Sequence, residues 1–339
     1  MEAVAALKEI AFWLERRQAT SYRVEAFRKA AAAIEHLDAD QVAAQAKDGR
    51  LKRIKGIGDR TFGVVQQVVA GEVPDYLAEL REEGATPLAE GGAALRAQLL
   101  GDLHSHSSWS DGGSSIEEMA RAASWRGRSY QVLTDHSPRL TVANGLSAER
   151  LAEQLDVVAQ VDAAHDDLRL LSGIEVDIHD DGSLDQTDAM LERLDVVVAS
   201  VHSKLRMESR AMTTRMMTAV ADPHTNVLGH CTGRLVQGGR GQRPQSEFNA
   251  KAVFAACAEF DVAVEINSRP ERQDPPDELI AIALDAGCLF AINTDAHAPG
   301  QLDFLDHGAE RADAAGVPAE RIITTWPVER LLEWSHSKR

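Results

Sequence analysis

Nine residues of types that bind metal ions stand at the ends of short apolar segments or just beyond them. They are six histidines and three carboxylates: His104, His106, Asp111, His136, Glu175, His202, His230, Asp295 and His297. The segments are 99–103, 130–134, 168–174, 194–200, 226–229, 262–266 and 289–294. Imidazole and carboxylate together suit zinc, manganese or iron, with no need of a thiolate. One such histidine has no special meaning, but the repeated pattern predicts a hydrolytic metal centre.

The spacing of these residues suggests how they could share cations. His104 and His106 are two apart, so in an extended segment both imidazoles face the same side. Asp111 precedes Gly112 and Gly113, a turn that can bring its carboxylate back toward the site. Nine ligands are too many for one four-coordinate ion, and they could supply three ions if a carboxylate bridges two. Packing so many such groups together would be prohibitively costly without cations.

The elements that must position these residues follow from the wider pattern. The apolar segments alternate with amphipathic helical stretches at 116–126, 147–164, 185–193, 209–221, 246–260, 276–286 and 302–315. Strands that alternate with helices indicate βαβ units and a parallel sheet. Seven repeats predict an α/β fold, a distorted (β/α)₇ barrel. Functional residues of barrels gather at the C-terminal ends of the strands, where the nine residues fall.

These motifs, in this order, resemble the PHP family of phosphoesterases (polymerase and histidinol phosphatase) over about residues 100–335. Every ligand position of the family has a matching residue type here, which implies an active metal-dependent enzyme with a trinuclear site. The resemblance implies one ion held by His104, His106, Glu175 and Asp295, a second by Glu175, His202 and His230, and a third by Asp111, His136 and His297. Glu175 would bridge the first two ions.

Such ions lower the pKa of a bound water, so hydroxide can attack a phosphoester near neutral pH. Arg234 is a candidate catalytic residue that grips phosphate, as are Lys204, Arg269 and Arg272. Asp135 is a second candidate, through a hydrogen bond to an imidazole ligand. For each cation alone, an ordinary surface role is the competing interpretation. The other histidines, His36, His165, His179, His224, His307 and His336, are expected on the surface.

Residues 1–83 are predicted to form a separate all-α domain, followed by a linker at 84–98 that is rich in Gly and Ala, and then by the barrel at 99–339. A Gly-Ile-Gly turn at 56–58 lets the backbone approach a phosphate. With its cations, this turn resembles the helix-hairpin-helix of DNA-binding proteins, which contact the DNA backbone. The candidate DNA-binding residues are Lys52, Arg53, Lys55, Gly56, Gly58 and Arg60.

A wider resemblance links the two parts of the chain. The stretches at 22–30 and 56–58 are similar to the N-terminal domain of bacterial and archaeal family X DNA polymerases, whose PHP domain is C-terminal. His230-Cys-Thr-Gly-Arg234 and the Glu-Ile-Asn at 265–267 are also similar to that subgroup, with Cys231 in place of the usual proline. The polymerase catalytic region has no counterpart here, so we expect no polymerase activity.

Composition limits the partners. The net charge is −17, but residues 1–84 carry 13 Lys/Arg against 14 Asp/Glu, so the acidity belongs to the remainder. That distribution leaves room for a DNA partner only at the N-terminal part. The sequence shows no membrane span and no leader, and three cysteines without a framework suit a reducing compartment, so we expect a cytoplasmic protein.

The leading hypothesis is a phosphoesterase at DNA ends, a 3′–5′ exonuclease or 3′-end-processing enzyme of DNA repair. Its substrate would be a phosphodiester or phosphomonoester, and its cofactors three divalent ions of zinc, manganese or iron. A small-molecule phosphatase of the histidinol-phosphate type is the second hypothesis, since a small substrate needs no basic track. A DNA-end-binding module with structural metals is the third, and the complete ligand set argues against it.

Overall fold

The computed structural model describes residues 1–239 and 241–338. The chain divides into two compact units, one made of Met1–Pro87 with Pro299–Gln301 and the other of Leu88–Ala298 with Leu302–Arg339. The division at 87–88 falls within the segment 84–98, which also contains the short helix α6 (Ala93–Arg96). Within the described part of the chain, no helix has the length and apolar character that crossing a bilayer requires.

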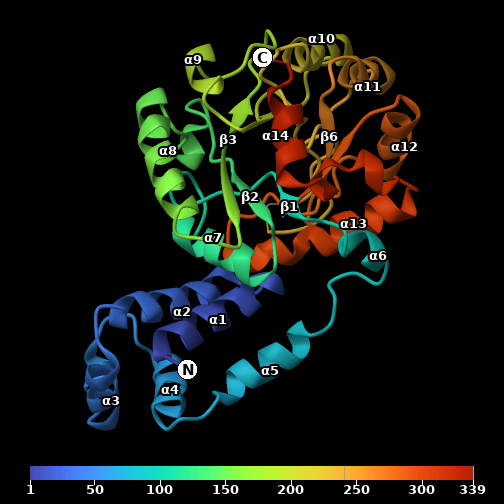
Figure 1. Ribbon diagram of the computed structural model, residues 1–339. Helices are drawn as coiled ribbons and strands as arrows, with labels where there is room; N and C mark the ends of the chain where they lie inside the picture. Colours follow the sequence, from blue (N-terminus) through green and yellow to red (C-terminus); the bar gives the residue numbers. More distant parts are fainter. Residues whose placement is uncertain (240, 339) are drawn as a thin grey trace. The chain divides into compact units, whose positions relative to one another are not determined.

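The first unit is a helical bundle (Figure 1). Its elements are α1 (Ala3–Arg16), α2 (Ser21–Ile34), α3 (Ala39–Lys47), the 3₁₀ turn η1 (Arg50–Arg53), α4 (Asp59–Val69) and α5 (Asp75–Gly84). Asp38 caps α3 by accepting from the Gln41 amide at 2.7 Å, and the Gln41 side chain accepts from the Asp38 amide in return; this reciprocal pair satisfies two free donors of the helix start. Leu7, Ile10 and Leu14 line the buried face of α1.

The second unit is built on seven parallel strands in the order β1 to β7 along the sheet. The strands are β1 (Gly101–Asp102), β2 (Tyr130–Leu133), β3 (Arg169–Asp177), β4 (Val196–Ser200), β5 (Val227–Leu228), β6 (Ala263–Asn267) and β7 (Phe290–Asn293). Just beyond β1 and β7, Ser105 and Ala296 form a parallel bridge, and the His106 amide donates to the Ala296 carbonyl at 2.8 Å. The sheet is therefore a nearly closed barrel, and the predicted (β/α)₇ fold is confirmed.

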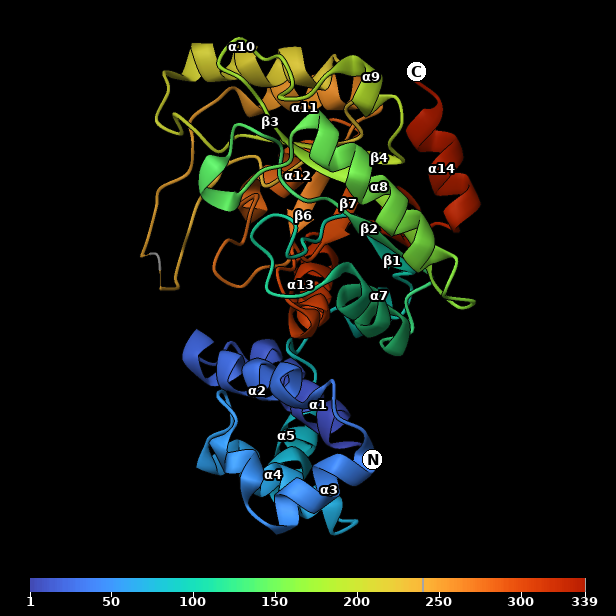
Figure 2. The same cartoon turned by 90° about the vertical axis from the view of Figure 1, so that its left-hand side faces the viewer.

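Helices surround the strands (Figures 1 and 2). They are α7 (Ile116–Trp125), α8 (Ala148–Asp162), α9 (Asp188–Leu191), α10 (Ser209–Val220), α11 (Ala250–Glu259), α12 (Asp277–Asp285), α13 (Leu305–Ala314) and α14 (Val328–His336), with 3₁₀ turns η2 (Thr141–Ala143), η3 (Pro299–Phe304), η4 (Ala319–Arg321) and η5 (Ile323–Thr325). Aliphatic strand residues fill the barrel interior together with Trp326, Leu331 and Trp334 from the C-terminal segment. This apolar packing fixes the strands, and the candidate metal ligands lie at the C-terminal ends of those strands.

Candidate metal centre

The nine predicted ligands all lie at the C-terminal ends of the barrel strands, and every strand except β6 supplies at least one. Glu175 belongs to β3 itself, whereas the others follow their strands within a few residues and Asp111 lies in the loop between β1 and α7. Asp295 has φ +52°, a left-handed conformation that is unusual for a non-glycine residue. Backbone strain of this kind clusters at functional sites.

Glu175 is the centre of the site, with its side chain 1% exposed. One carboxylate oxygen, Oε1, lies 2.8 Å from His230 Nε2 and 3.2 Å from His202 Nε2. The other, Oε2, lies 2.9 Å from His136 Nδ1, 3.3 Å from His104 Nε2 and 3.6 Å from His106 Nε2. Five imidazoles from four loops and strands thus converge on one carboxylate, an arrangement suited to a bridging ligand.

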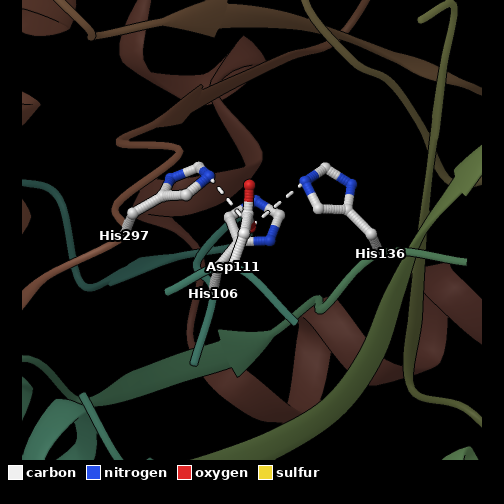
Figure 3. Close-up of side chains that lie close together, drawn as sticks. All are labelled: His106, Asp111, His136 and His297. Carbon is white, nitrogen blue, oxygen red and sulfur yellow. Dashed lines mark ion pairs between the residues drawn. The ribbon is translucent and has the colours of Figure 1, made fainter. Parts of the chain in front are cut away.

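A second group lies around Asp111 (Figure 3). The figure shows His136 and His297 on either side of Asp111 with their rings turned toward it; their Nε2 atoms are 3.5 and 3.3 Å from Asp111 Oδ1. His106 completes the group, and the four ligand atoms lie within 4.8 Å of one another. Asp295 Oδ1 is 3.4 Å from His106 Nε2, so His106 stands between this group and the one at Glu175.

The structure groups the ligands much as the expected partition does, with one difference. Three sets could each hold an ion: His106, Asp111, His136 and His297; His104, His106 and Glu175; and His136, Glu175 and His202. His106 and His136 therefore each face two sets, whereas the partition gives each of them to one ion. His230 joins the site through its contact with Glu175.

The lone pairs of these groups fit cations. Among the described residues, His104 Nε2, both nitrogens of His106 and both oxygens of Glu175 are buried without a hydrogen-bond partner, which is costly unless something else satisfies them. Burial, reinforced by His297 and His136, holds the pKa of His106 well below its ordinary value, so its ring is neutral and able to bind metal. Burial alone would raise the pKa of Glu175, but the surrounding imidazoles hold it well below the ordinary value, so the carboxylate is ionised.

Two domain families match the chain. The helix-hairpin-helix domain family matches residues 1–73 and the PHP domain family matches residues 102–269. The chain carries a helix-hairpin-helix domain and a PHP domain. The resemblance to both domain families that the sequence suggested is thereby confirmed.

Individual relatives differ in how much of them is matched. The DNA polymerase/3′-5′ exonuclease PolX of Bacillus subtilis is 39% identical over 226 residues, which cover 67% of this chain but only 39% of that protein. The probable phosphatase YcdX of Escherichia coli is 27% identical over 251 residues, 70% of this chain and 94% of that protein. A solved structure of histidinol phosphate phosphatase from Lactococcus lactis, complexed with zinc, L-histidinol and phosphate, has a TM-score of 0.48 and 18% identity and covers 64% of this chain and 94% of that one.

The PHP domain contains supporting residues that the sequence analysis missed. The carboxylate of Glu265 lies 2.6 Å from His104 Nδ1, and Asp177 Oδ1 lies 3.5 Å from His202 Nδ1. Glu265 is a charged residue in the otherwise apolar segment 262–266, and Asp177 comes two residues after Glu175, on the same face of β3; these are the signals that could have revealed them. A carboxylate against the second nitrogen of a ligand histidine fixes the orientation of the ring.

Asp135 makes different contacts from those expected. Its carboxylate accepts from the Ser107 amide and hydroxyl at 2.8 and 2.6 Å, from Gln154 Nε2 at 2.6 Å and from the Ser110 hydroxyl. None of these partners, among the described residues, is an imidazole, because the side chain turns toward the loop at 107–110. Burial raises the pKa of this carboxyl. Asp135 therefore ties the loop that leads to Asp111 to the end of β2.

The candidate phosphate-binding cations are largely engaged within the protein. Arg234 Nε donates to the Arg272 and Gln273 carbonyls at 3.2 and 2.8 Å, and Arg272 Nε lies 3.0 Å from Asp295 Oδ2. Arg269 Nη1 lies 2.9 Å from His297 Nδ1, and Lys204 forms an ion pair with Asp180. Arg269 and Arg272 thus contact ligands directly, whereas the contacts of Arg234 are to the loop that holds Arg272.

The surface histidines of the sequence analysis include one exception. His224 is buried, with Nδ1 2.9 Å from Asp222 Oδ1. Asp222, two residues earlier, gives the imidazole a hydrogen-bond partner, so the ring can be buried without an unsatisfied polar atom at Nδ1. The expectation of a surface position is wrong for this residue.

The candidate DNA-binding residues surround the turn before α4. Gly56 has φ +103°, Ile57 is buried, and Gly58 precedes the first residue of α4. The side chain of Thr61 accepts from the Gly58 amide at 2.9 Å. Lys52, Arg53, Lys55 and Arg60 are exposed, although Lys52 Nζ lies 2.8 Å from Asp59 Oδ1. The turn therefore presents backbone and cations together, as expected for a phosphate contact.

Proposed function

We propose that this chain is a metal-dependent phosphoesterase that hydrolyses phosphodiester or phosphomonoester bonds at DNA ends, as a 3′–5′ exonuclease or 3′-end-processing enzyme. The observation that carries the proposal is the convergence of five imidazoles on the buried Glu175 carboxylate, with lone pairs left unsatisfied. The helix-hairpin-helix domain in the same chain supports a DNA substrate. The identity to PolX, named a 3′-5′ exonuclease, supports the reaction class.

The nine ligands would hold three divalent ions, with Glu175 shared between two of them. Bound ions would supply an acidified water as nucleophile and would neutralise charge on the phosphate. The chain's own contribution is to hold the imidazoles and the ionised Glu175 carboxylate at fixed positions around the same space. Arg269 and Arg272, which contact His297 and Asp295, bring positive charge to the same side of the site.

The N-terminal domain would hold the DNA. Lys52, Arg53, Lys55 and Arg60, with the amides around Gly56 and Gly58, would contact backbone phosphates without reading the base sequence. The proposal includes no polymerase activity, because only residues 74–101 separate the two matched domains.

The test uses the full-length protein with manganese and a primer that carries a 3′-terminal label. We expect release of labelled nucleotide from a 3′-hydroxyl end, or of phosphate from a 3′-phosphate end. Turnover of a small phosphomonoester with no release from either DNA end would contradict the DNA assignment. His104→Ala should abolish hydrolysis while DNA affinity, measured by fluorescence anisotropy, stays within twofold; activity in a fully metal-loaded His104→Ala protein would mean that the site is misplaced.

A second candidate is a small-molecule phosphatase of the histidinol-phosphate type. Two observations favour it: the match to the probable phosphatase YcdX spans 94% of that protein, and the acidic excess of the chain lies beyond residue 84. Comparing the kcat/KM for histidinol phosphate with that for an oligonucleotide under one metal condition separates the two. A preference for histidinol phosphate of more than about tenfold, or about 1.4 kcal/mol, would favour the phosphatase.

A further inference from the structure

Glu265 lies in the middle of β6 with its side chain fully buried. Oε1 accepts from His104 Nδ1 at 2.6 Å and from Asn293 Nδ2 at 2.9 Å. Oε2 accepts from the His230 amide at 2.6 Å and from Asn267 Nδ2 at 3.1 Å. Glu265 thus accepts four hydrogen bonds, although it is not itself among the nine expected ligands.

The four donors connect Glu265 to three of those ligands. His104 follows β1 and is bound through its ring, and His230 follows β5 and is bound through its backbone. Asn267 donates to Asp295 Oδ2 at 3.1 Å as well as to Glu265. Asn293, in turn, accepts from the Leu103 amide at 3.1 Å through Oδ1, beside the start of the His104 segment.

The contact with His104 decides which of its nitrogens can bind a cation. A carboxylate accepts hydrogen bonds and offers no proton, so Nδ1 carries the hydrogen that points at Glu265. The lone pair is then on Nε2, and Nε2 is the nitrogen that faces Glu175 at 3.3 Å without a hydrogen-bond partner. For His202 the corresponding contact, to Asp177, is longer at 3.5 Å.

We propose that Glu265 is a positioning residue of the metal centre, which holds His104 in the tautomer that binds metal through Nε2 and fixes the place of His230. The proposal rests on the metal centre of the proposed function. A purely structural carboxylate would accept only from backbone and side-chain amides. Glu265 also contacts a ligand ring, at His104 Nδ1, and its equally short contact of 2.6 Å is to the backbone amide of a second ligand, His230.

Replacing the carboxylate by an amide tests this directly. In Glu265→Gln, one oxygen becomes an NH₂ donor and faces either His104 Nδ1 or the His230 amide. In the first case the ring proton moves to Nε2 and removes the lone pair, and in the second the His230 backbone is displaced. Loss of such a supporting contact typically weakens metal binding by about 10- to 100-fold.

Asp102→Asn is the matched control. Asp102 is a buried carboxylate next to the same segment, and it accepts from the Thr294 amide at 3.1 Å, from the Thr294 hydroxyl and from the His104 amide at 3.1 Å. Among the described residues it contacts the backbone of His104 but no ligand ring, so its amide variant should lower thermal stability and leave zinc affinity within about threefold of the wild type. It thus measures what the loss of a buried carboxylate alone does.

The readouts are zinc affinity by competition with a chromophoric chelator, and the visible absorption of the cobalt(II)-substituted protein. We expect zinc binding about 10- to 100-fold weaker and an altered cobalt spectrum in Glu265→Gln alone. Equal zinc affinity and an unchanged spectrum in the two variants would overturn the positioning role. A wild-type protein that binds no transition metal would instead refute the metal centre of the proposed function.

A measurement on the wild type keeps the proposal testable if Glu265→Gln does not fold. Nitrogen-15 spectra of histidine-labelled, zinc-loaded protein report which ring nitrogen carries hydrogen, and the His104 signal is assigned by its loss in His104→Ala. We expect hydrogen on Nδ1. Hydrogen on Nε2 of His104 would overturn the proposal.

Discussion

Replacing Glu175 by glutamine is the most informative perturbation of the site. Its two oxygens lie between 2.8 and 3.6 Å from five imidazole nitrogens. The amide keeps the shape of the side chain but removes the charge that two ions are expected to share, and its nitrogen offers hydrogens where a cation should bind. We therefore expect the variant to lose metal affinity much more than it loses fold.

The size of the effect follows from burial. Removing one partner of a buried charge pair costs about 3–5 kcal/mol. At the lower limit, 3 kcal/mol corresponds to a dissociation constant for metal that is roughly 100-fold larger. At saturating metal the stabilisation of the native state falls by the same amount. A domain of about 150–250 residues shifts its Tm by about 2–4 °C per kcal/mol, so the rise in Tm on adding manganese should shrink by about 6–12 °C.

Differential scanning calorimetry measures this rise in Tm when it compares protein stripped of metal by a chelator with the same protein after manganese is added. Asp195→Asn is the control, because Asp195 contacts Ser172 at 2.8 Å at the opposite end of the barrel strands. It makes the same chemical change, and it should leave the metal-induced rise in Tm intact. An undiminished rise in Glu175→Gln, with the wild-type number of bound ions, would refute the bridging role.

Further predictions concern metal dependence and the N-terminal domain. Dialysis against a chelator should abolish phosphoester hydrolysis and added manganese or zinc should restore it; turnover by protein that elemental analysis finds free of metal would contradict the mechanism. Reversing the charges of Lys52, Arg53 and Lys55 should weaken DNA binding and lower the salt slope of the affinity by up to about 3, as anisotropy titrations at several salt concentrations can show; an unchanged slope would leave the turn a structural role. Gly56→Ala should destabilise the domain by about 1 kcal/mol or more in urea unfolding, since φ is +103° and a Cβ would lie 3.2 Å from a carbonyl oxygen, whereas Gly63→Ala, inside α4 with open space around it, should be neutral or stabilising.

The sequence predicted the fold because its apolar segments are short, regularly spaced and separated by amphipathic helices. The expected strand at 130–134, for example, is found as β2 (Tyr130–Leu133), and the expected helix at 116–126 as α7 (Ile116–Trp125). A polar residue after each strand then has one place to go, the C-terminal mouth of the barrel. Periodicity and topology together therefore located His136 and its counterparts without any coordinates.

What the sequence could not predict is which groups face each other within that mouth. Asp135 directly precedes a ligand, which made an imidazole contact plausible, yet neighbouring residues of an extended segment point to opposite sides. Its carboxylate accordingly turns away from the ring of His136 to Ser107. The sequence could not show, for a related reason, that His106 and His136 each lie between two groups of ligands, because such sharing depends on distances between loops.

The same alternation explains how Glu265 could have been found. In the stretch Ala263–Asn267, the side chains of Glu265 and Asn267 share one face of β6, and that face lies toward the mouth, where both contact Asp295 or His104. Ionising a carboxylate inside a barrel is so costly that it must have dedicated donors. A charged residue in an apolar strand segment of this fold is therefore better interpreted as support for a neighbouring site than as an exception to the pattern. The amide substitution at Glu265 tests that rule on a carboxylate with two expected metal ligands, His104 and His230, among its four donors.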